Sequence, residues 1–243
     1  MLTLFKREIS GFFSSLTGYV VIIVFLVLNG LFIWVFHGDF NVPDTGYASL
    51  DPMFVLAPWV FLFLVPAVTM RLFSDEKHAG TIELLFTRPL TEMQIILAKY
   101  LAGLTLVVLS LLPTLIYYYS VYQLGNPVGI IDSGGFWGSF IGLIFLAGVY
   151  VSIGLFTSSL TDNQIISFIL GVLICFILFL GFDSIANLGF SGFWENLLKS
   201  LGIAFHYNSM ARGVIDTRDV IYFFSVIAIF IFFTKIVLES RKW

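Results

Sequence analysis

Six long apolar runs dominate the chain and restrict it to one class of fold. No Asp, Glu, Lys, Arg or His interrupts the first five runs, and the sixth meets only Lys235 near its end. A helix needs roughly 20 apolar residues to cross a bilayer. In lipid, a helix satisfies its own backbone hydrogen bonds, whereas separate strands would leave their edges unpaired. The sequence therefore predicts six transmembrane helices, at 16–36, 53–70, 100–124, 136–160, 165–182 and 220–238.

The composition leaves no room for a soluble catalytic domain. The chain is 59% hydrophobic and 11% charged, whereas soluble domains carry about 25% charged residues. The longest stretch between two predicted spans, 183–219, is too short for an independent core without disulfides or metal. Cys175 is the single cysteine, so no intramolecular disulfide forms, and the three His show no metal-ligand spacing. We expect one all-α membrane domain over 1–243, with no catalytic, cofactor or metal site in this chain.

The connector 71–99, between the second and third predicted spans, is rich in charge and in helix-breaking signals. Gly80 interrupts it, and Thr81 is a candidate N-cap with Glu83 in the first turn. Pro89 disfavours a helical conformation for the residue before it. The pattern predicts a short, separate helix over 82–87, presented in a water-exposed connector at the mouth of two spans.

Two further helix starts have the spacing of a capping box, in which the first and fourth side chains each bond the other residue's backbone N–H. Thr91 and Gln94 precede the third span, with Leu90 and Ile95 at the positions of a hydrophobic staple. In SSLTDNQ, residues 158–164, Thr161 and Gln164 repeat the spacing before the fifth span. We expect a tight turn there.

Two segments outside the spans are amphipathic. Residues 1–15 place apolar side chains on one helical side and Lys6, Arg7 and Glu8 on the other, which predicts an interfacial helix. In 183–219, one helical face holds Phe193, Trp194, Leu197, Leu198, Leu201 and Phe205. The polar residues that follow are candidates for substrate or partner contact, or else cap helices at a re-entrant turn: His206, Ser209, Arg212, Asp216 and Asp219.

The distribution of Lys and Arg predicts the orientation, because these residues concentrate on the cytoplasmic side. Placing both termini and the connector on one side collects nine of the 12 Lys and Arg residues there, and Lys199, Arg212 and Arg218 fall on the other. We therefore expect a multi-pass membrane protein with both termini and the connector cytoplasmic.

Several stretches resemble a known family. DEKHAGTIELLFTRPLT, residues 75–91, is similar to the signature between the second and third spans of ABC-2 type transporter permeases, and SSLTDNQ is similar to their turn before span five. Longer stretches resemble the gliding-motility-associated ABC permeases of Bacteroidetes (GldF): SLTGYVVIIVFLVLNGLFIWVF, LAPWVFLFLVPAVTMR, LLPTLIYYYSVYQLGNPVG and HYNSMARGVIDTRDVIYF. These four stretches reach the first, second, third and sixth predicted spans.

The resemblance implies a membrane subunit of an exporter linked to gliding motility, driven by a separate ABC ATP-binding subunit. The chain has no GxxxxGK[ST] phosphate-binding loop, so ATP and Mg would be bound by that partner. A second permease, the same chain or a different one, and membrane lipid are the other expected partners; nucleic acid is not. Carried over to this sequence, coupling to the ATPase subunit falls on Asp75, Glu76, Gly80, Thr81, Glu83, Leu84, Leu85 and Pro89.

Two other functions stay open at this point. A carrier driven by an ion gradient usually needs an ionisable residue near mid-membrane, and no predicted span has one at that depth. A membrane scaffold that anchors motility machinery is the other alternative. Purification together with an ATP-binding subunit would separate the ABC permease from both.

Overall fold

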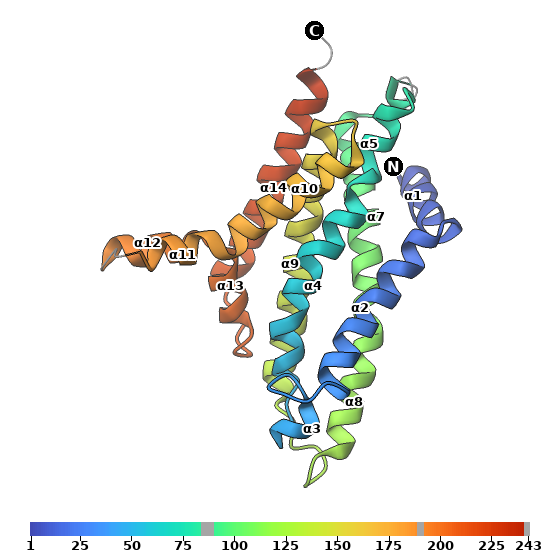
Figure 1. Ribbon diagram of the computed structural model, residues 1–243. Helices are drawn as coiled ribbons and strands as arrows, with labels where there is room; N and C mark the ends of the chain where they lie inside the picture. Colours follow the sequence, from blue (N-terminus) through green and yellow to red (C-terminus); the bar gives the residue numbers. More distant parts are fainter. Residues whose placement is uncertain (84–89, 189–191, 241–243) are drawn as a thin grey trace.

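The computed structural model describes residues 1–83, 90–188 and 192–240, and every regular element within those ranges is helical (Figure 1). The predicted all-α fold class is confirmed. In chain order the elements are α1 (Leu2–Ser14), α2 (Leu16–Trp34), α3 (Val42–Thr45), α4 (Asp51–Thr69), α5 (Arg71–His78), α7 (Glu92–Leu111), the 3-10 turn η1 (Leu112–Thr114), α8 (Leu115–Leu124), α9 (Ser133–Leu160), α10 (Gln164–Phe176), the π-turn η2 (Ile177–Gly181), α11 (Phe182–Ala186), α12 (Phe193–Leu201), α13 (Ile203–Met210) and α14 (Thr217–Glu239).

Six helical stretches of the described chain are long and apolar enough to cross a membrane, as predicted: Leu16–Trp34, Asp51–His78, Glu92–Leu124, Ser133–Leu160, Gln164–Ala186 and Thr217–Glu239. The second of them runs eight residues beyond the predicted end, because α5 continues α4 through Arg71–His78. This part of the connector is not a water-exposed loop: Leu72 and Phe73 are buried, and no Gly or Pro interrupts the chain before Gly80.

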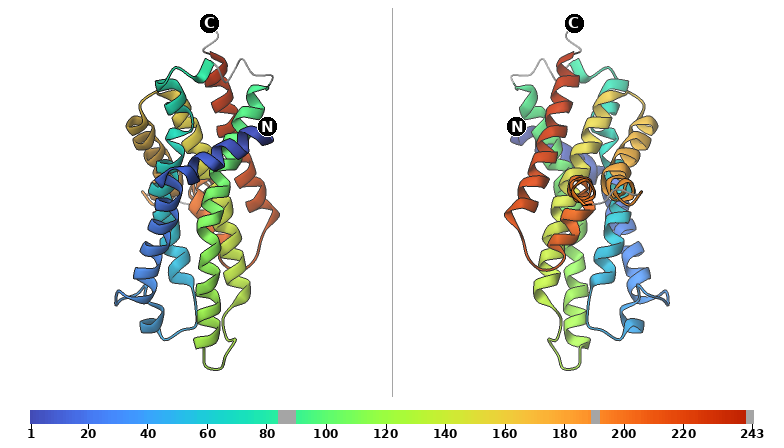
Figure 2. Two further views of the ribbon diagram at one scale, coloured as in Figure 1. Left: turned by 90° about the vertical axis from the view of Figure 1, so that its right-hand side faces the viewer. Right: turned by 90° about the vertical axis from the view of Figure 1, so that its left-hand side faces the viewer.

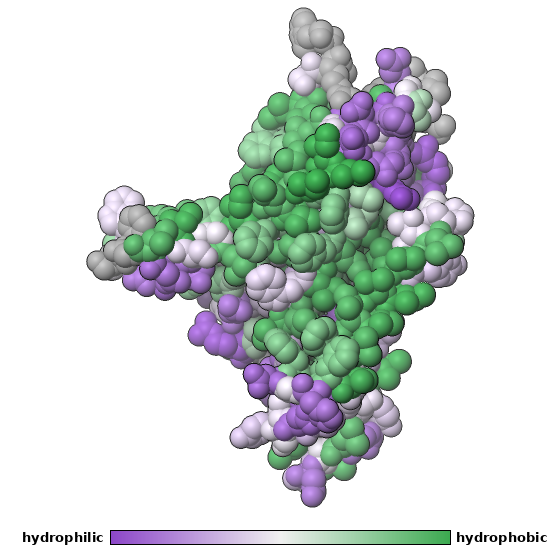
Figure 3. Space-filling view, in the orientation of Figure 1, coloured by the Kyte–Doolittle hydropathy of each residue, from purple (hydrophilic) through white to green (hydrophobic). Residues whose placement is uncertain are grey.

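Helix α9 forms the centre of the bundle. It packs against α4, α7, α10, α13 and α14, and most of its length is buried. Small residues permit the close approach: a Cβ on Gly154 would overlap the Thr69 side chain of α4, and a Cβ on Gly138 would lie 2.8 Å from the Gly213 Cα. By contrast, α2, α10 and α14 expose most of their apolar side chains. These side chains form the hydrophobic surface in Figure 3 that suits lipid.

Polar side chains gather at the two ends of the bundle (Figure 3). Helices α1 and α5 and the C-terminal end of α14 lie at one end, which we call the connector end (Figures 1 and 2). Helix α3 and the turn between α8 and α9 lie at the opposite end. Two statements stay predictions: that α1 lies along a membrane surface, and that the connector end faces the cytoplasm.

The segment between α10 and α14 leaves the bundle and returns. Helices α11 and α12 project sideways, and α13 runs back beside α9 (Figures 1 and 2). The predicted continuous helical face from Phe193 to Phe205 is wrong, because α12 ends at Leu201 and Gly202 has extended backbone (ψ 138°) before α13 begins. Phe205 therefore belongs to the next helix. The Glu195–Lys199 ion pair (2.8 Å) lies on α12.

The two predicted capping boxes have different outcomes. At α7 the box is present: the Thr91 side chain accepts from the Gln94 N–H, and the Gln94 side chain accepts from the Thr91 N–H. At α10 the prediction is wrong. Asn163 is the N-cap there, and its Oδ1 accepts the N–H groups of Ile165 and Ile166 at 2.9 and 3.4 Å.

Candidate functional site

The end of α5 is a tight turn in which the backbone is fully bonded. The Gly80 N–H donates to the Lys77 carbonyl (3.1 Å), and the Thr81 N–H donates to the Glu76 carbonyl (2.9 Å). This pair of bonds defines a Schellman motif, which needs a left-handed residue that glycine supplies without strain. Gly80 has φ +65°, and the Thr81 hydroxyl adds a third bond to the Glu76 carbonyl (3.3 Å). The sequence thus fixes the direction in which the chain leaves α5.

Part of the predicted coupling segment lies outside the described residues. Leu84, Leu85 and Pro89 fall there, together with most of the expected helix 82–87 and the N-cap bonds expected of Thr81. Of the residues before them, Ile82 packs partly buried against the core and Glu83 is exposed.

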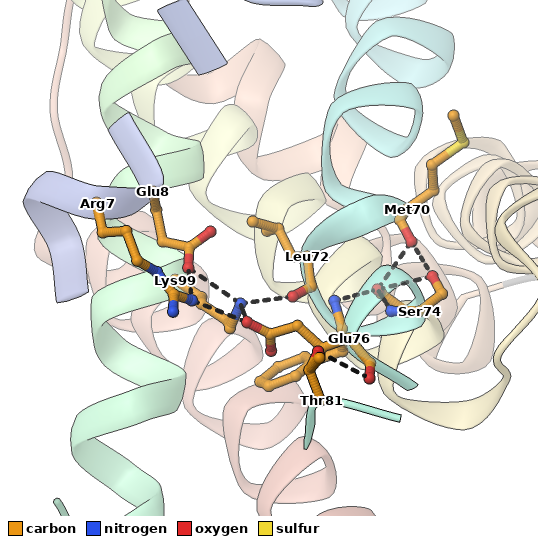
Figure 4. A network of polar contacts seen from close by, with 10 residues as sticks. Arg7, Glu8, Met70, Leu72, Ser74, Glu76, Thr81 and Lys99 are labelled. Atoms are coloured by element: carbon orange, nitrogen blue, oxygen red, sulfur yellow. Dashed lines mark hydrogen bonds and ion pairs between the residues drawn. The ribbon is translucent and has the colours of Figure 1, made fainter. Parts of the chain in front are cut away.

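A buried lysine joins α1, α5 and α7 at the connector end (Figure 4). Lys99, on α7, is 1% exposed, and its ammonium contacts Glu8 (3.2 Å), Glu76 (3.1 Å) and the Leu72 carbonyl (2.6 Å). A lysine has three N–H donors; those of Lys99 make hydrogen bonds to Glu8 and to the Leu72 carbonyl, and the ammonium forms an ion pair with Glu76. The Phe73 ring lies 5.2 Å from the same nitrogen and adds a cation–π contact.

Arg7 completes this cluster from the solvent side. Its guanidinium contacts Glu8 (2.8 Å) and Glu76 (2.9 Å), so two cations and two anions alternate. We call Arg7, Glu8, Glu76 and Lys99 the charge junction. Buried charges are costly unless they are paired and hydrogen-bonded. One oxygen, Glu76 Oε2, is buried without a hydrogen-bond partner among the described residues.

The other side of α5 is bonded to the last turn of α9 and to the first residue of α10. The Ser158 hydroxyl accepts the N–H groups of Phe73 (2.8 Å) and Ser74 (3.1 Å) and donates to the Met70 carbonyl (2.9 Å). Lys77 donates to the Ser159 carbonyl, and Gln164 donates to Asp75. The SSLTDNQ turn is therefore a contact of the connector, and Gln164 serves this contact.

These bonds place α5 between two parts of the bundle, with α1 and α7 on one side and the end of α9 and the start of α10 on the other. Asp75 and Glu76 take part in this contact, whereas Glu83 does not within the described residues. The arrangement links α5 to α1, α7, α9 and α10 at once.

The candidates between α12 and α14 form helix-terminal contacts. His206 Nδ1 lies 2.7 Å from Asp219 Oδ1, and its Nε2 donates to the Ser200 carbonyl (2.8 Å). Both side chains of the pair are buried, and the Tyr222 ring stacks on the imidazole. Arg212 donates to Ser209, and Asp216 is the N-cap of α14, accepting the Arg218 N–H (2.9 Å). Of the two interpretations of these residues, substrate contact or helix capping, the structure supports capping for Asp216.

Sequence reasoning missed Arg7, Glu8, Lys99 and Ser158. Lys99 is the last charged residue before a long uncharged run, and Arg7 and Glu8 share the polar side of the first helix. Those local signals mark charge at an interface, but they do not indicate which charges meet.

The fold and this junction define a helical, multi-pass membrane protein with a bonded, charged assembly at one end of its bundle. A family model described as ABC-2 family transporter protein matches residues 38–238. Because the match spans most of the sequence, the chain belongs to the ABC-2 transporter family. It is accordingly a permease subunit of an ABC transporter, a membrane component that works with an ABC ATPase subunit. A search of the curated proteins gives no match.

Proposed function

We propose that this chain is the permease of an ABC exporter whose ATP-binding subunit docks at the connector end. The charge junction carries the proposal, because it fixes α5 to α1 and α7 directly before the segment that would meet the ATPase. A force applied to that segment would reach α5 through the Schellman turn at Gly80. From there it would pass to α7 through Lys99 and to the α9–α10 turn through Ser158.

In this proposal the chain performs no ATP chemistry and holds no cofactor. ATP and Mg belong to the ATPase subunit, whose contacts would include Asp75, Glu76, Gly80, Thr81 and Glu83. Leu84, Leu85 and Pro89 would complete the docking segment. Glu83 is the best described contact candidate, since it is exposed and has no described intramolecular bond.

We further propose a place in the bacterial inner membrane with both termini cytoplasmic, a second permease subunit beside this one, and an export function in gliding motility. Helix α1 and the C-terminal end of α14 share one end of the bundle with the connector, as this topology requires. The concentration of Lys and Arg there supports the cytoplasmic assignment. The resemblance to GldF permeases supports the motility role.

The test is purification of the tagged chain from native membranes, with identification of its bound subunits and measurement of their ATPase activity. We expect an ABC ATP-binding subunit in the complex. Glu83→Gln and Gly80→Ala should insert normally but uncouple ATP hydrolysis from transport. Alanine at φ +65° costs about 1–2 kcal/mol and redirects the chain after α5. Glu239→Gln, at an exposed acid of the same end, is the matched control. A complex without an ATPase, or full coupling in both variants, would contradict the proposal.

One observation favours a second function, an ion-coupled carrier. The His206–Asp219 pair is buried, and Nδ1 lies 2.7 Å from Oδ1, so the described chain encloses a polar pair away from the connector end. A carrier of this kind would lose activity when an uncoupler collapses the proton gradient at fixed ATP. The ABC permease would retain its activity.

A further inference from the structure

A cavity opens at the end of the bundle opposite the connector. It has a volume of about 720 Å³ and lies between the α2–α4 loop and the α8–α9 turn. We call it the loop cavity; its walls include Trp34, Val42, Tyr47, Leu124, Ile130 and Asp132. Small-molecule sites commonly have volumes of about 300–1,000 Å³ and combine apolar walls with a few polar groups. The loop cavity has the size and the composition of such a site.

The polar groups of the loop cavity suit a positively charged ligand. Asp132 supplies a carboxylate, while Asn126 and Ser49 supply an amide and a hydroxyl. Asp132 Oδ1 accepts the Gly135 N–H at the start of α9 (3.0 Å), and no bond to Oδ2 is present among the described residues. The lining contains no Lys, Arg or His. Asp132 is in no ion pair among the described residues, so its carboxylate could take a cation as partner without displacing another charge.

The surroundings of the loop cavity have the same sign of charge. The loops 35–50 and 125–132, with the first residue of α4, contain Asp39, Asp44, Asp51 and Asp132 and no Lys or Arg. Their one basic side chain, His37, lies 2.8 Å from Asp44 at the surface. The potential at this end therefore attracts cations and repels anions. Phosphate or carboxylate ligands are disfavoured for the same reason.

The aromatic and aliphatic walls of the loop cavity favour an organic cation over a metal ion. Indole and phenol faces attract an ammonium or quaternary ammonium group through their quadrupoles, most strongly when little water intervenes. Trp34 is partly buried and packs edge-on against Tyr117 at 6.2 Å, which fixes the indole in place. Apolar walls suit the carbon substituents of an organic cation better than a hydrated metal ion.

We propose that the loop cavity binds an organic cation, an amine or a quaternary ammonium group, with Asp132 as its counter-charge and Trp34 as its aromatic contact. The site is separate from the charge junction. It does not depend on which subunit drives transport, so its failure in a binding assay leaves the proposed function unaffected.

The experiment is calorimetric titration of the purified full-length chain in lipid nanodiscs with choline. A second titration uses 3,3-dimethyl-1-butanol, which has the same shape without the charge. We expect choline to bind at least tenfold more tightly than the alcohol. Equal affinity for the two compounds, or no saturable binding of choline, would overturn the proposal.

Three variants assign the site. Asp132→Asn should weaken choline binding at least tenfold while retaining the cap of α9, because Asn is as good an N-cap as Asp. Trp34→Leu should weaken choline binding and leave the alcohol unaffected. Asp39 lies in the α2–α4 loop but outside the lining of the loop cavity. Asp39→Asn is therefore the control and should change the affinity for choline less than twofold. Unchanged binding in Asp132→Asn would show that the cation binds elsewhere.

Discussion

The sharpest test of the charge junction is Lys99→Met, which removes the central ammonium and keeps most of the side-chain volume. In the wild-type chain this ammonium lies 3.1–3.2 Å from two carboxylates that are themselves only 15% and 17% exposed. Without it, Glu8 and Glu76 face each other across the space that the lysine occupied. Arg7 remains, but it is half exposed and reaches them from the solvent side.

The expected cost follows from this burial. Removing one partner of a buried ion pair destabilises a protein by about 3–5 kcal/mol, because a buried charge is left without compensation. Lys235→Met at the same end is the matched control. Its pair with Glu239 is 3.4 Å long and 37–47% exposed. An exposed i,i+4 pair contributes only about 0.3–0.5 kcal/mol.

The assay is reversible denaturation of the purified chain in mixed micelles, with free energies of unfolding compared among four proteins. The fourth is a triple variant, Lys99→Met with Glu8→Gln and Glu76→Gln, in which the buried charges are absent. We expect it to be more stable than the single variant, because the cost of the single variant is electrostatic. If the triple variant is no more stable, or if Lys99→Met costs no more than Lys235→Met, the electrostatic reasoning is refuted.

Three further predictions concern packing and helix ends. Gly154→Ala should lower the free energy of unfolding by about 1–3 kcal/mol, since the new methyl group would overlap the Thr69 side chain of α4. Gly11 has open space around it, so Gly11→Ala should not be destabilising. Equal losses of stability in the two variants would contradict the packing argument. Asn163→Ala should cost about 1 kcal/mol as the loss of an N-cap, measured in the same assay, and Thr161→Ala should cost less if Asn163 is the cap. Asp219→Ala should cost about 1–3 kcal/mol, because it leaves the buried imidazole Nδ1 without a hydrogen-bond partner. Hydrogen exchange should then accelerate in α13, and unchanged protection there would show that the pair does not hold the segment.

The sequence predicts the membrane spans well because their signal is local. Each span is an uncharged run, and in lipid such a run has no alternative to a helix except a closed barrel. The capping box at Thr91 and Gln94 is also local, since the bonded atoms are three residues apart. At α10 the capping-box spacing of Thr161 and Gln164 does not identify the N-cap. Asn163 lies directly before the helix, and its short amide side chain accepts the first N–H groups in place of Thr161.

The charge junction is beyond such reasoning, since it depends on pairing between distant parts of the chain. Glu8 meets Lys99 across 91 residues, and Ser158 meets Phe73 across 85. Each residue has an ordinary local explanation as an interfacial charge or a small polar residue at a helix end. Only the packing of α1, α5, α7 and α9 selects which of the several charges near the membrane surface are brought together.

The position of these polar contacts follows from what apolar helices lack. Lipid tails are as apolar as Leu, so helices in a bilayer gain little from hydrophobic burial and associate through close packing and hydrogen bonds. Along α9, glycine contacts at Gly154 and Gly138 supply the close packing. At the connector end, Ser158 binds α5, and Lys99 binds α1 and α5 to α7. A charged contact has one register, because a shift by one turn would separate partners that lie about 3 Å apart. The junction thus fixes the register of helices whose apolar faces would pack almost equally well in several positions.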